Sequence, residues 1–161
     1  MTDRDRFIVR YGPLFEHSPW VVERAADHLP LIDLHTELMA VVHDATTEDQ
    51  LALIRAHPEL AGRAAIDGAL TEASAAEQAS AGLDRLTPAE YERFHALNAA
   101  YGQRFGFPFI ICVRLTDKAG ILAAMETRLT HDHEKEITTA IAEIGKIVQL
   151  RLRDLMPEER A

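Results

Sequence analysis

The chain has 161 residues, of which 47% are hydrophobic and 27% are charged. These proportions are ordinary for a globular protein, and they exclude collagen-like, low-complexity and fully disordered chains. Acidic residues outnumber basic ones by 26 to 17, and the formal charge of −9 repels a phosphate backbone, so we expect no nucleic-acid partner.

The sequence after residue 17 predicts two helices in succession. Ser18 can cap a helix whose first position is Pro19, and Pro30 ends that helix after about three turns. Apolar residues then recur at helical spacing over residues 31–42, which predicts the second helix.

A third predicted helix begins near residue 46 and ends at Ala56, immediately before His57 and Pro58. Because proline disfavours the α conformation at the residue before it, His57 should lie at or just past the end of this helix. The carbonyl-rich end of a helix favours a protonated imidazole, by about 0.3–1 kcal/mol at an exposed site. His57 is therefore a candidate proton donor, and the alternative is an ordinary C-terminal helix residue.

A loop with two glycines leads to an alanine-rich helix predicted over residues 71–81, which Gly82 ends. Ser74, Glu77 and Gln78 lie at positions i, i+3 and i+4 and therefore share one face of this helix. Their hydroxyl, carboxylate and carboxamide could grip a planar heterocycle or a ureido group through paired donors and acceptors. The alternative is a solvated helix face.

The residues Thr87-Pro88-Ala89-Glu90 combine a capping box with a proline in the first turn, and they predict a helix that Gly106 ends. Apolar and aromatic residues recur along it at helical spacing, at Tyr91, Phe94, Leu97 or Asn98, Tyr101 and Phe105.

The longest apolar run, residues 107–113, contains Pro108 and is much shorter than the roughly 20 residues that cross a bilayer, so we expect no membrane span. Its amides must find partners, either other backbone groups or a bound carbonyl beside Phe109 and Ile111. Cys112 is the single cysteine and cannot form an intrachain disulfide. We therefore expect a reducing, cytoplasmic location.

The last part of the chain predicts a helix capped by Asp117 that runs through Leu129, and a long helix over residues 133–155. Arg151 falls on the apolar stripe of the long helix, four residues beyond Ile147. A guanidinium group keeps its charge, so a buried Arg151 needs an anionic or carbonyl partner. That partner could be a ligand or an internal Asp or Glu.

These elements predict an all-α, single-domain compact helical bundle that spans residues 1–161, because the one strand-like stretch, residues 109–115, has nothing to pair with. Residues 131–133 read His-Asp-His and resemble a metal-ligand cluster only in composition, so we expect no metal. The sequence also has no phosphate-binding glycine loop and no dinucleotide fingerprint, which argues against a bound nucleotide.

Taken in order, five segments resemble the 2-oxo-4-hydroxy-4-carboxy-5-ureidoimidazoline (OHCU) decarboxylase family. They are FEHSPW at 15–20, AHPELAG at 56–62, SAAEQASAGL at 74–83, LNAAY at 97–101 and RFGFPFI at 104–110. The resemblance continues through residues 146–152 and covers nearly the whole chain. The sequence departs from the family pattern at Leu115, where a glycine is expected, and at residues 131–135, which are unusually rich in histidine and basic residues.

The resemblance implies an all-helical, commonly dimeric enzyme that needs no cofactor and performs the last step from urate to (S)-allantoin. It implies that His57 is the catalytic histidine and Glu77 an essential carboxylate. The positions implied to line the substrate pocket are Pro58, Ser74, Gln78, Phe109, Ile111 and Arg151.

The implied chemistry suits these residues. When the C4 carboxylate leaves as carbon dioxide, its electron pair can enter the adjacent C5=N bond, so the substrate is its own electron sink and no cofactor is needed. We expect His57 to move a proton at the C4 hydroxyl or the ring, and Glu77 to orient either the histidine or the ureido N–H groups. Two alternatives stay open, namely a hydrolase of a related ureide or cyclic amide and a non-catalytic helical binding module.

Overall fold

The computed structural model describes residues 1–62 and 68–155, and every regular element in these ranges is a helix. The predicted all-α class is therefore confirmed, and residues 109–115 form no strand but end in a short 3-10 helix. In the same ranges, no helix is long and apolar enough to cross a membrane. The elements are α1 (Asp3–Tyr11), η1 (Gly12–Phe15), α2 (Trp20–Ala26), α3 (Leu34–Asp44), α4 (Thr47–Arg55), α6 (Glu72–Ser80), α7 (Pro88–Phe105), η2 (Val113–Leu115), α8 (Lys118–Arg128) and α9 (His133–Leu155).

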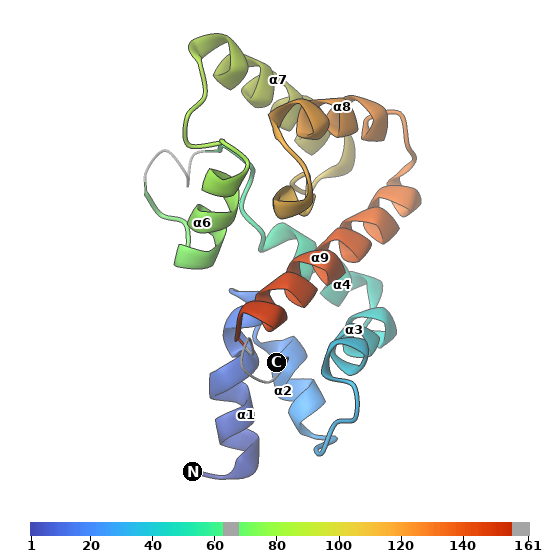
Figure 1. Ribbon diagram of the computed structural model, residues 1–161. Helices are drawn as coiled ribbons and strands as arrows, with labels where there is room; N and C mark the ends of the chain where they lie inside the picture. The colour runs from blue at the N-terminus through green and yellow to red at the C-terminus, as the bar shows by residue number, and fades with distance from the viewer. Residues whose placement is uncertain (63–67, 156–161) are drawn as a thin grey trace.

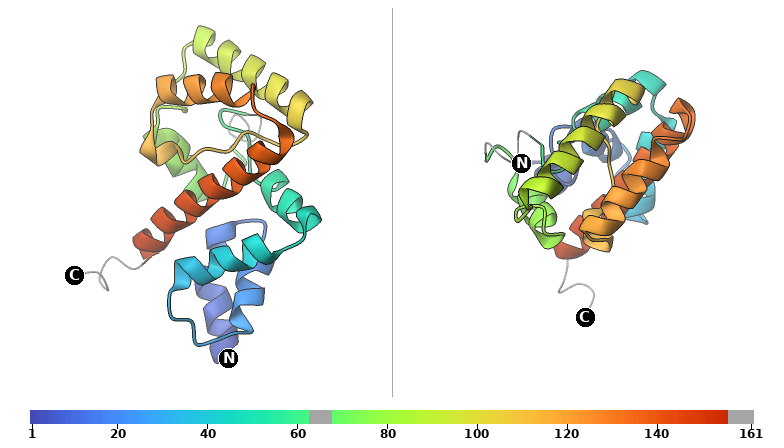
Figure 2. Two further views of the ribbon diagram at one scale, coloured as in Figure 1. Left: turned by 90° about the vertical axis from the view of Figure 1, so that its right-hand side faces the viewer. Right: turned by 90° about the horizontal axis from the view of Figure 1, so that it is seen from above.

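The long helix α9 organises the molecule. Figure 1 shows it crossing diagonally between the N-terminal helices α1, α2 and α3 and the pair α7 and α8, and the side view in Figure 2 shows the same division. It packs against α3, α4 and η1. Its buried side is a stripe at helical spacing that includes Ile141, Ile144, Val148, Arg151 and Leu152. The helix is therefore held by burial along one face rather than by its ends.

Helices α7 and α8 start at the predicted capping residues Thr87 and Asp117, and α4 and α6 start close to their predicted positions, also behind side-chain caps. The side chains of Thr46, Thr71, Thr87 and Asp117 each accept a hydrogen bond from the backbone amide three residues later. Such caps stabilise a protein by about 0.5–2 kcal/mol each. The capping box at Thr87 is complete, because the Glu90 carboxylate also accepts from the Thr87 amide.

Two predictions in the N-terminal part are wrong. Helix α2 begins after Pro19 with no side-chain cap from Ser18, and it ends at Ala26 after seven residues, well before Pro30. Helix α1 has no counterpart among the predicted helices, although Thr2 and Asp5 form a capping box at its start. Its apolar residues Phe7, Ile8 and Tyr11 pack against the core but stay partly exposed, and charged residues make up most of the rest of the helix.

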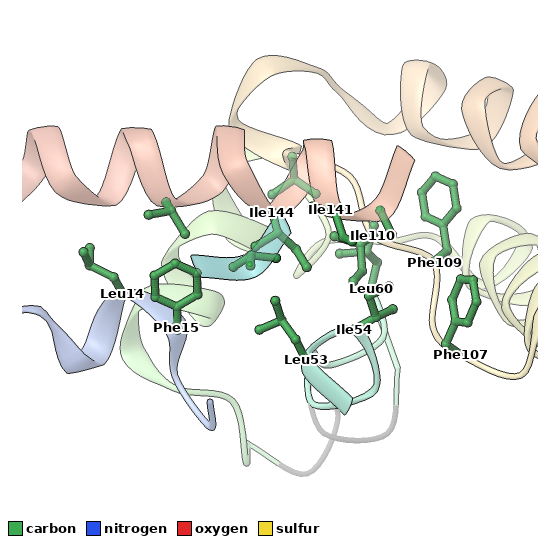
Figure 3. Packing of buried hydrophobic residues seen from close by; sticks show 14 of the residues in the cluster. Leu14, Phe15, Leu53, Ile54, Leu60, Phe107, Phe109, Ile110, Ile141 and Ile144 are labelled. Carbon is green, nitrogen blue, oxygen red and sulfur yellow. The ribbon is translucent and has the colours of Figure 1, made fainter. Parts of the chain in front are cut away.

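The core lies where three segments meet the middle of α9. Figure 3 shows Phe15 of η1, Leu53 of α4 and Ile110 of the segment before η2 gathered below Ile144. These four side chains are between 0% and 3% exposed. The apolar segment 107–113 is therefore a linker through the core, and its Cys112 is buried as a free thiol. Tyr91, which the helical spacing places with the buried residues of α7, is 38% exposed instead.

A buried polar network fixes this linker from the side of α7, α8 and α9. Arg128 donates to the carbonyl of Ile110 at 2.6 Å and to the carboxylate of Glu136 at 2.8 Å, and its guanidinium lies 4.2 Å from the ring centre of Phe109. The Tyr101 hydroxyl also donates to Glu136, which is fully buried. The position of Phe109 in the core thus depends on a charge pair that joins α8 to α9.

Candidate active site

A pocket lies between α6, α9 and the core-crossing linker. The structure brings all eight sequence-predicted site residues to its wall, although their roles remain predictions. They are His57, Pro58, Ser74, Glu77, Gln78, Phe109, Ile111 and Arg151. The wall also includes residues that were not predicted, among them Leu60, Arg114 and Ile147.

His57 lies two residues past the end of α4, as the proline after it predicts. Its Nδ1 lies 3.0 Å from the carbonyl oxygen of Leu53. Because a carbonyl only accepts hydrogen bonds, Nδ1 carries the hydrogen, and Nε2 of the neutral ring keeps a free lone pair. The imidazole is thus oriented by this carbonyl, and both roles expected for Glu77 stay predictions.

The electrostatic setting of His57 keeps the ring neutral. Burial lowers the pKa of His57, while the bond to Leu53 and the charges of Glu16 and Glu77 act in the opposite direction, and the net pKa lies below the ordinary value. The charge of Arg151 also lowers it. The helix-end effect expected from the sequence, which favours the protonated ring, is therefore outweighed by loss of hydration.

Glu77 and Arg151 form a two-pronged ion pair between α6 and α9. Arg151 donates from Nε to Oε2 of Glu77 at 2.8 Å and from Nη2 to Oε1 at 2.7 Å. It also donates from Nη2 to Glu16 at 2.8 Å and from Nη1 to the carbonyl of Leu14 at 3.2 Å. The two partners expected for a buried Arg151 were a ligand and an internal Asp or Glu. The structure shows the second kind, namely Glu16 and Glu77. These four bonds leave one of its five N–H donors for a ligand.

Glu16 is a site residue that the sequence analysis missed. It follows η1, its side chain is only 5% exposed, and it accepts from Ser74 Oγ at 2.5 Å, from Thr71 Oγ1 at 2.9 Å and from Arg151. Burial acts to raise the pKa of Glu16, but these hydrogen bonds and the charge of Arg151 bring it below its ordinary value. Its only sequence signal is its place in the FEHSPW segment.

Two amide side chains hold the loop that follows His57. Gln78 of α6 accepts from the amide of Ala61 at 3.0 Å and donates to the carbonyl of Glu59 at 3.4 Å. Asn98 of α7 donates to the carbonyl of Leu60 at 2.9 Å. Gln78 therefore positions the histidine-bearing loop as well as lining the pocket.

The linker opposite α6 offers backbone donors. Of residues 109–112, only Cys112 donates its amide to a protein group in the part of the chain that the structure describes, namely the Glu143 carboxylate at 3.0 Å. The amide of partly buried Ile111 is thus available to a bound carbonyl, which is one of the two options expected for this segment.

Residues 131–133 serve the fold. His131 Nδ1 lies 2.9 Å from the Glu136 carboxylate, and His133 Nε2 lies 3.1 Å from the carbonyl of Phe105. Among residues 1–62 and 68–155, no group of three or more His, Cys, Asp or Glu side chains is arranged to hold a metal ion.

Residues 1–153 match the family model described as OHCU decarboxylase. The chain belongs to the OHCU decarboxylase family. The resemblance inferred from the five sequence segments is therefore confirmed.

Individual relatives agree with this assignment. An OHCU decarboxylase of Haloferax volcanii is 43% identical over 98% of this chain and 93% of its own length. Another, of Halalkalicoccus jeotgali, is 45% identical over 95% of this chain and 86% of its own length. The crystal structure of an (S)-allantoin synthase superposes with a TM-score of 0.76 at 30% identity over 96% of this chain, which spans 50% of that protein.

Proposed function

We propose that this protein decarboxylates OHCU to (S)-allantoin in urate degradation. The observation that carries the proposal is that the His57 imidazole, the Glu77 carboxylate paired with Arg151 and the linker residue Ile111 line one pocket of a family member. The residue roles below follow from that geometry and from the chemistry of the substrate.

The reaction needs an electron sink and one proton. As the bond between C4 and the carboxyl group breaks, carbon dioxide leaves and the electron pair forms a C4=C5 double bond. The former C5=N pair moves to the ring nitrogen, which takes a proton from solvent. The C4 hydroxyl then loses its proton and becomes a carbonyl while C5 is protonated, so that one proton is consumed in total.

His57 is suited to carry the internal proton. Its Nε2 has the free lone pair, so it can accept the proton of the C4 hydroxyl and return it to C5. Because the ring is held by Leu53, delivery takes place on one face of C5, which would yield a single allantoin enantiomer.

The two polar walls complement the two ends of the substrate. Ser74 and Glu77 on α6 are acceptors for the ureido N–H groups, and the Ile111 amide is a donor for the ring carbonyl. The apolar side chains of Phe109 and Ile147 leave the departing carboxylate with little solvation, and this favours its conversion to neutral carbon dioxide.

The test is to generate OHCU in solution from urate and to follow the circular dichroism of the product with and without the protein. We expect rapid appearance of one allantoin enantiomer together with stoichiometric carbon dioxide. A hydrolase would consume the substrate without releasing carbon dioxide. A non-catalytic binding module would leave the slow, racemic time course of the uncatalysed reaction unchanged.

We also propose that the protein is a homodimer, as the family resemblance implies. We propose that it is cytoplasmic, as the single cysteine implies. Light scattering during gel filtration tests the dimer, for which we expect twice the mass of the chain at micromolar concentration. A mass of one chain under those conditions would contradict it.

A further inference from the structure

The hydroxyl group of Ser74 has one hydrogen, and it donates that hydrogen to Glu16 in a hydrogen bond. Ser74 Oγ lies 2.5 Å from Oε1 of Glu16, and Thr71 Oγ1 lies 2.9 Å from the same oxygen. An ionised carboxylate accepts but never donates, so both hydroxyl hydrogens must point to Glu16. The Ser74 oxygen therefore shows only lone pairs to the pocket that it lines.

The Glu16 carboxylate also reduces the number of N–H donors that Arg151 can offer to a ligand. Its Oε1 accepts from Arg151 Nη2, whose other bond goes to Glu77. The α6 side of the pocket, which Ser74 and Glu77 line, is consequently rich in acceptors, and four of the five N–H donors of the nearby guanidinium are engaged. A ureido group has three N–H donors and matches such a wall.

The backbone at Glu16 indicates that its position is imposed by these contacts. Glu16 has a φ of +43°, a backbone conformation that residues other than glycine rarely adopt. Residues keep such conformations only where the surroundings over-determine them, and they concentrate at functional sites. Here the surroundings are the three donors, which come from α9, α6 and the cap of α6.

We propose that Glu16 is a positioning residue that fixes Ser74 as a hydrogen-bond acceptor and thereby makes the pocket prefer ligands with a ureido group. The inference rests on the proposed function, whose substrate and product both carry that group. Glu16 acts through Ser74 and does not touch the reacting atoms.

The test replaces Glu16 by glutamine, which keeps the shape of the side chain. A glutamine amide can donate to Ser74 and thus allow the serine hydrogen to turn toward the pocket. Calorimetry would compare the dissociation constants of (S)-allantoin and of hydantoin, a related ring without the ureido group. For Glu16→Gln we expect about tenfold weaker allantoin binding and unchanged hydantoin binding. Glu72→Gln, an exposed change on the same helix, should alter neither.

A second variant keeps the inference testable if Glu16→Gln does not fold. Ser74→Ala removes the acceptor itself. It should weaken allantoin binding about as much as Glu16→Gln does and leave hydantoin binding unchanged. The double variant should be no worse than either single one, because both remove the same contact. Equal weakening of both ligands, or no change in either, would overturn the role of Glu16 and Ser74 in ligand preference.

Turnover separates this inference from the proposed function. If the wild-type protein does not convert OHCU, the proposed function fails whatever the binding ratio. If it converts OHCU while Glu16→Gln keeps the wild-type ratio of the two dissociation constants, only the present inference fails.

Discussion

His57 is oriented by the hydrogen bond from its Nδ1 to the carbonyl of Leu53. Asparagine in its place is similar in size and cannot carry a proton near neutral pH. For His57→Asn we expect kcat for OHCU to fall by about 10²–10⁴-fold, the usual contribution of acid–base catalysis, with the circular dichroism of the fold unchanged. His43→Asn on the exposed side of α3 is the matched control and should keep full activity. Unchanged turnover in His57→Asn would remove the residue from the mechanism.

The lowered pKa of His57 also fixes the direction of the pH dependence. The base form is needed for catalysis, and burial keeps that form populated to a lower pH than in a free histidine. The acid limb of kcat/KM should therefore have its midpoint below about 6.5, the ordinary histidine value. Initial rates measured between pH 5 and 8 test this, with OHCU supplied at each pH. A midpoint above that value would mean that the imidazole is stabilised in its charged form.

At the scale of elements, α6 and α7 hold the loop after His57 through Gln78 and Asn98. Removing the Gln78 amide leaves the buried amide of Ala61 without its partner, which costs about 1–3 kcal/mol. Gln78→Ala should therefore lower the free energy of unfolding in urea by that amount and also lower kcat, because the histidine-bearing loop loses its anchor. Gln103→Ala on the exposed face of α7 is the control. A stable variant with wild-type kcat would show that the loop does not depend on this side chain.

The helices themselves could be predicted wherever the signal is local. Threonine and aspartate caps mark the starts of α4, α6, α7 and α8 because capping involves residues only three positions apart. The end of α2 could not be predicted, since Pro30 shows where a helix cannot continue but not where it stops.

The site was predictable to the same extent. Local spacing offers His57 and the stripe of Ser74, Glu77 and Gln78 only as candidates, and the family resemblance is what selects them. The pairing of Arg151 with Glu16 joins residues 135 positions apart. No periodicity or motif spacing reports a contact of that kind, so an internal acid could be foreseen as a class of partner for Arg151 but not as this residue.

At the scale of the whole molecule, the buried pair of Arg128 and Glu136 links α8, α9 and the core-crossing linker. Glu136 is fully buried and also accepts from Tyr101 at 2.5 Å. Glu136→Gln leaves the Arg128 charge buried without its counterion, and we expect a loss of about 3–5 kcal/mol in the free energy of unfolding. Urea denaturation measures it.

The matched control for this variant is Glu134→Gln, an exposed change two residues earlier in α9. It should shift the free energy of unfolding by no more than about 0.5 kcal/mol. Equal stability of the two variants would mean that the pair is not a support of the core.

The place of Arg151 in the final turns of α9 has a consequence for copies of the protein that lack their C-terminal end. The two acids that it neutralises, Glu16 and Glu77, are synthesised long before it. Without that cation, the folded protein would have to bury two negative groups close together, and these groups repel each other. A copy of the protein that lacks Arg151 should therefore be inactive and less stable than the full chain.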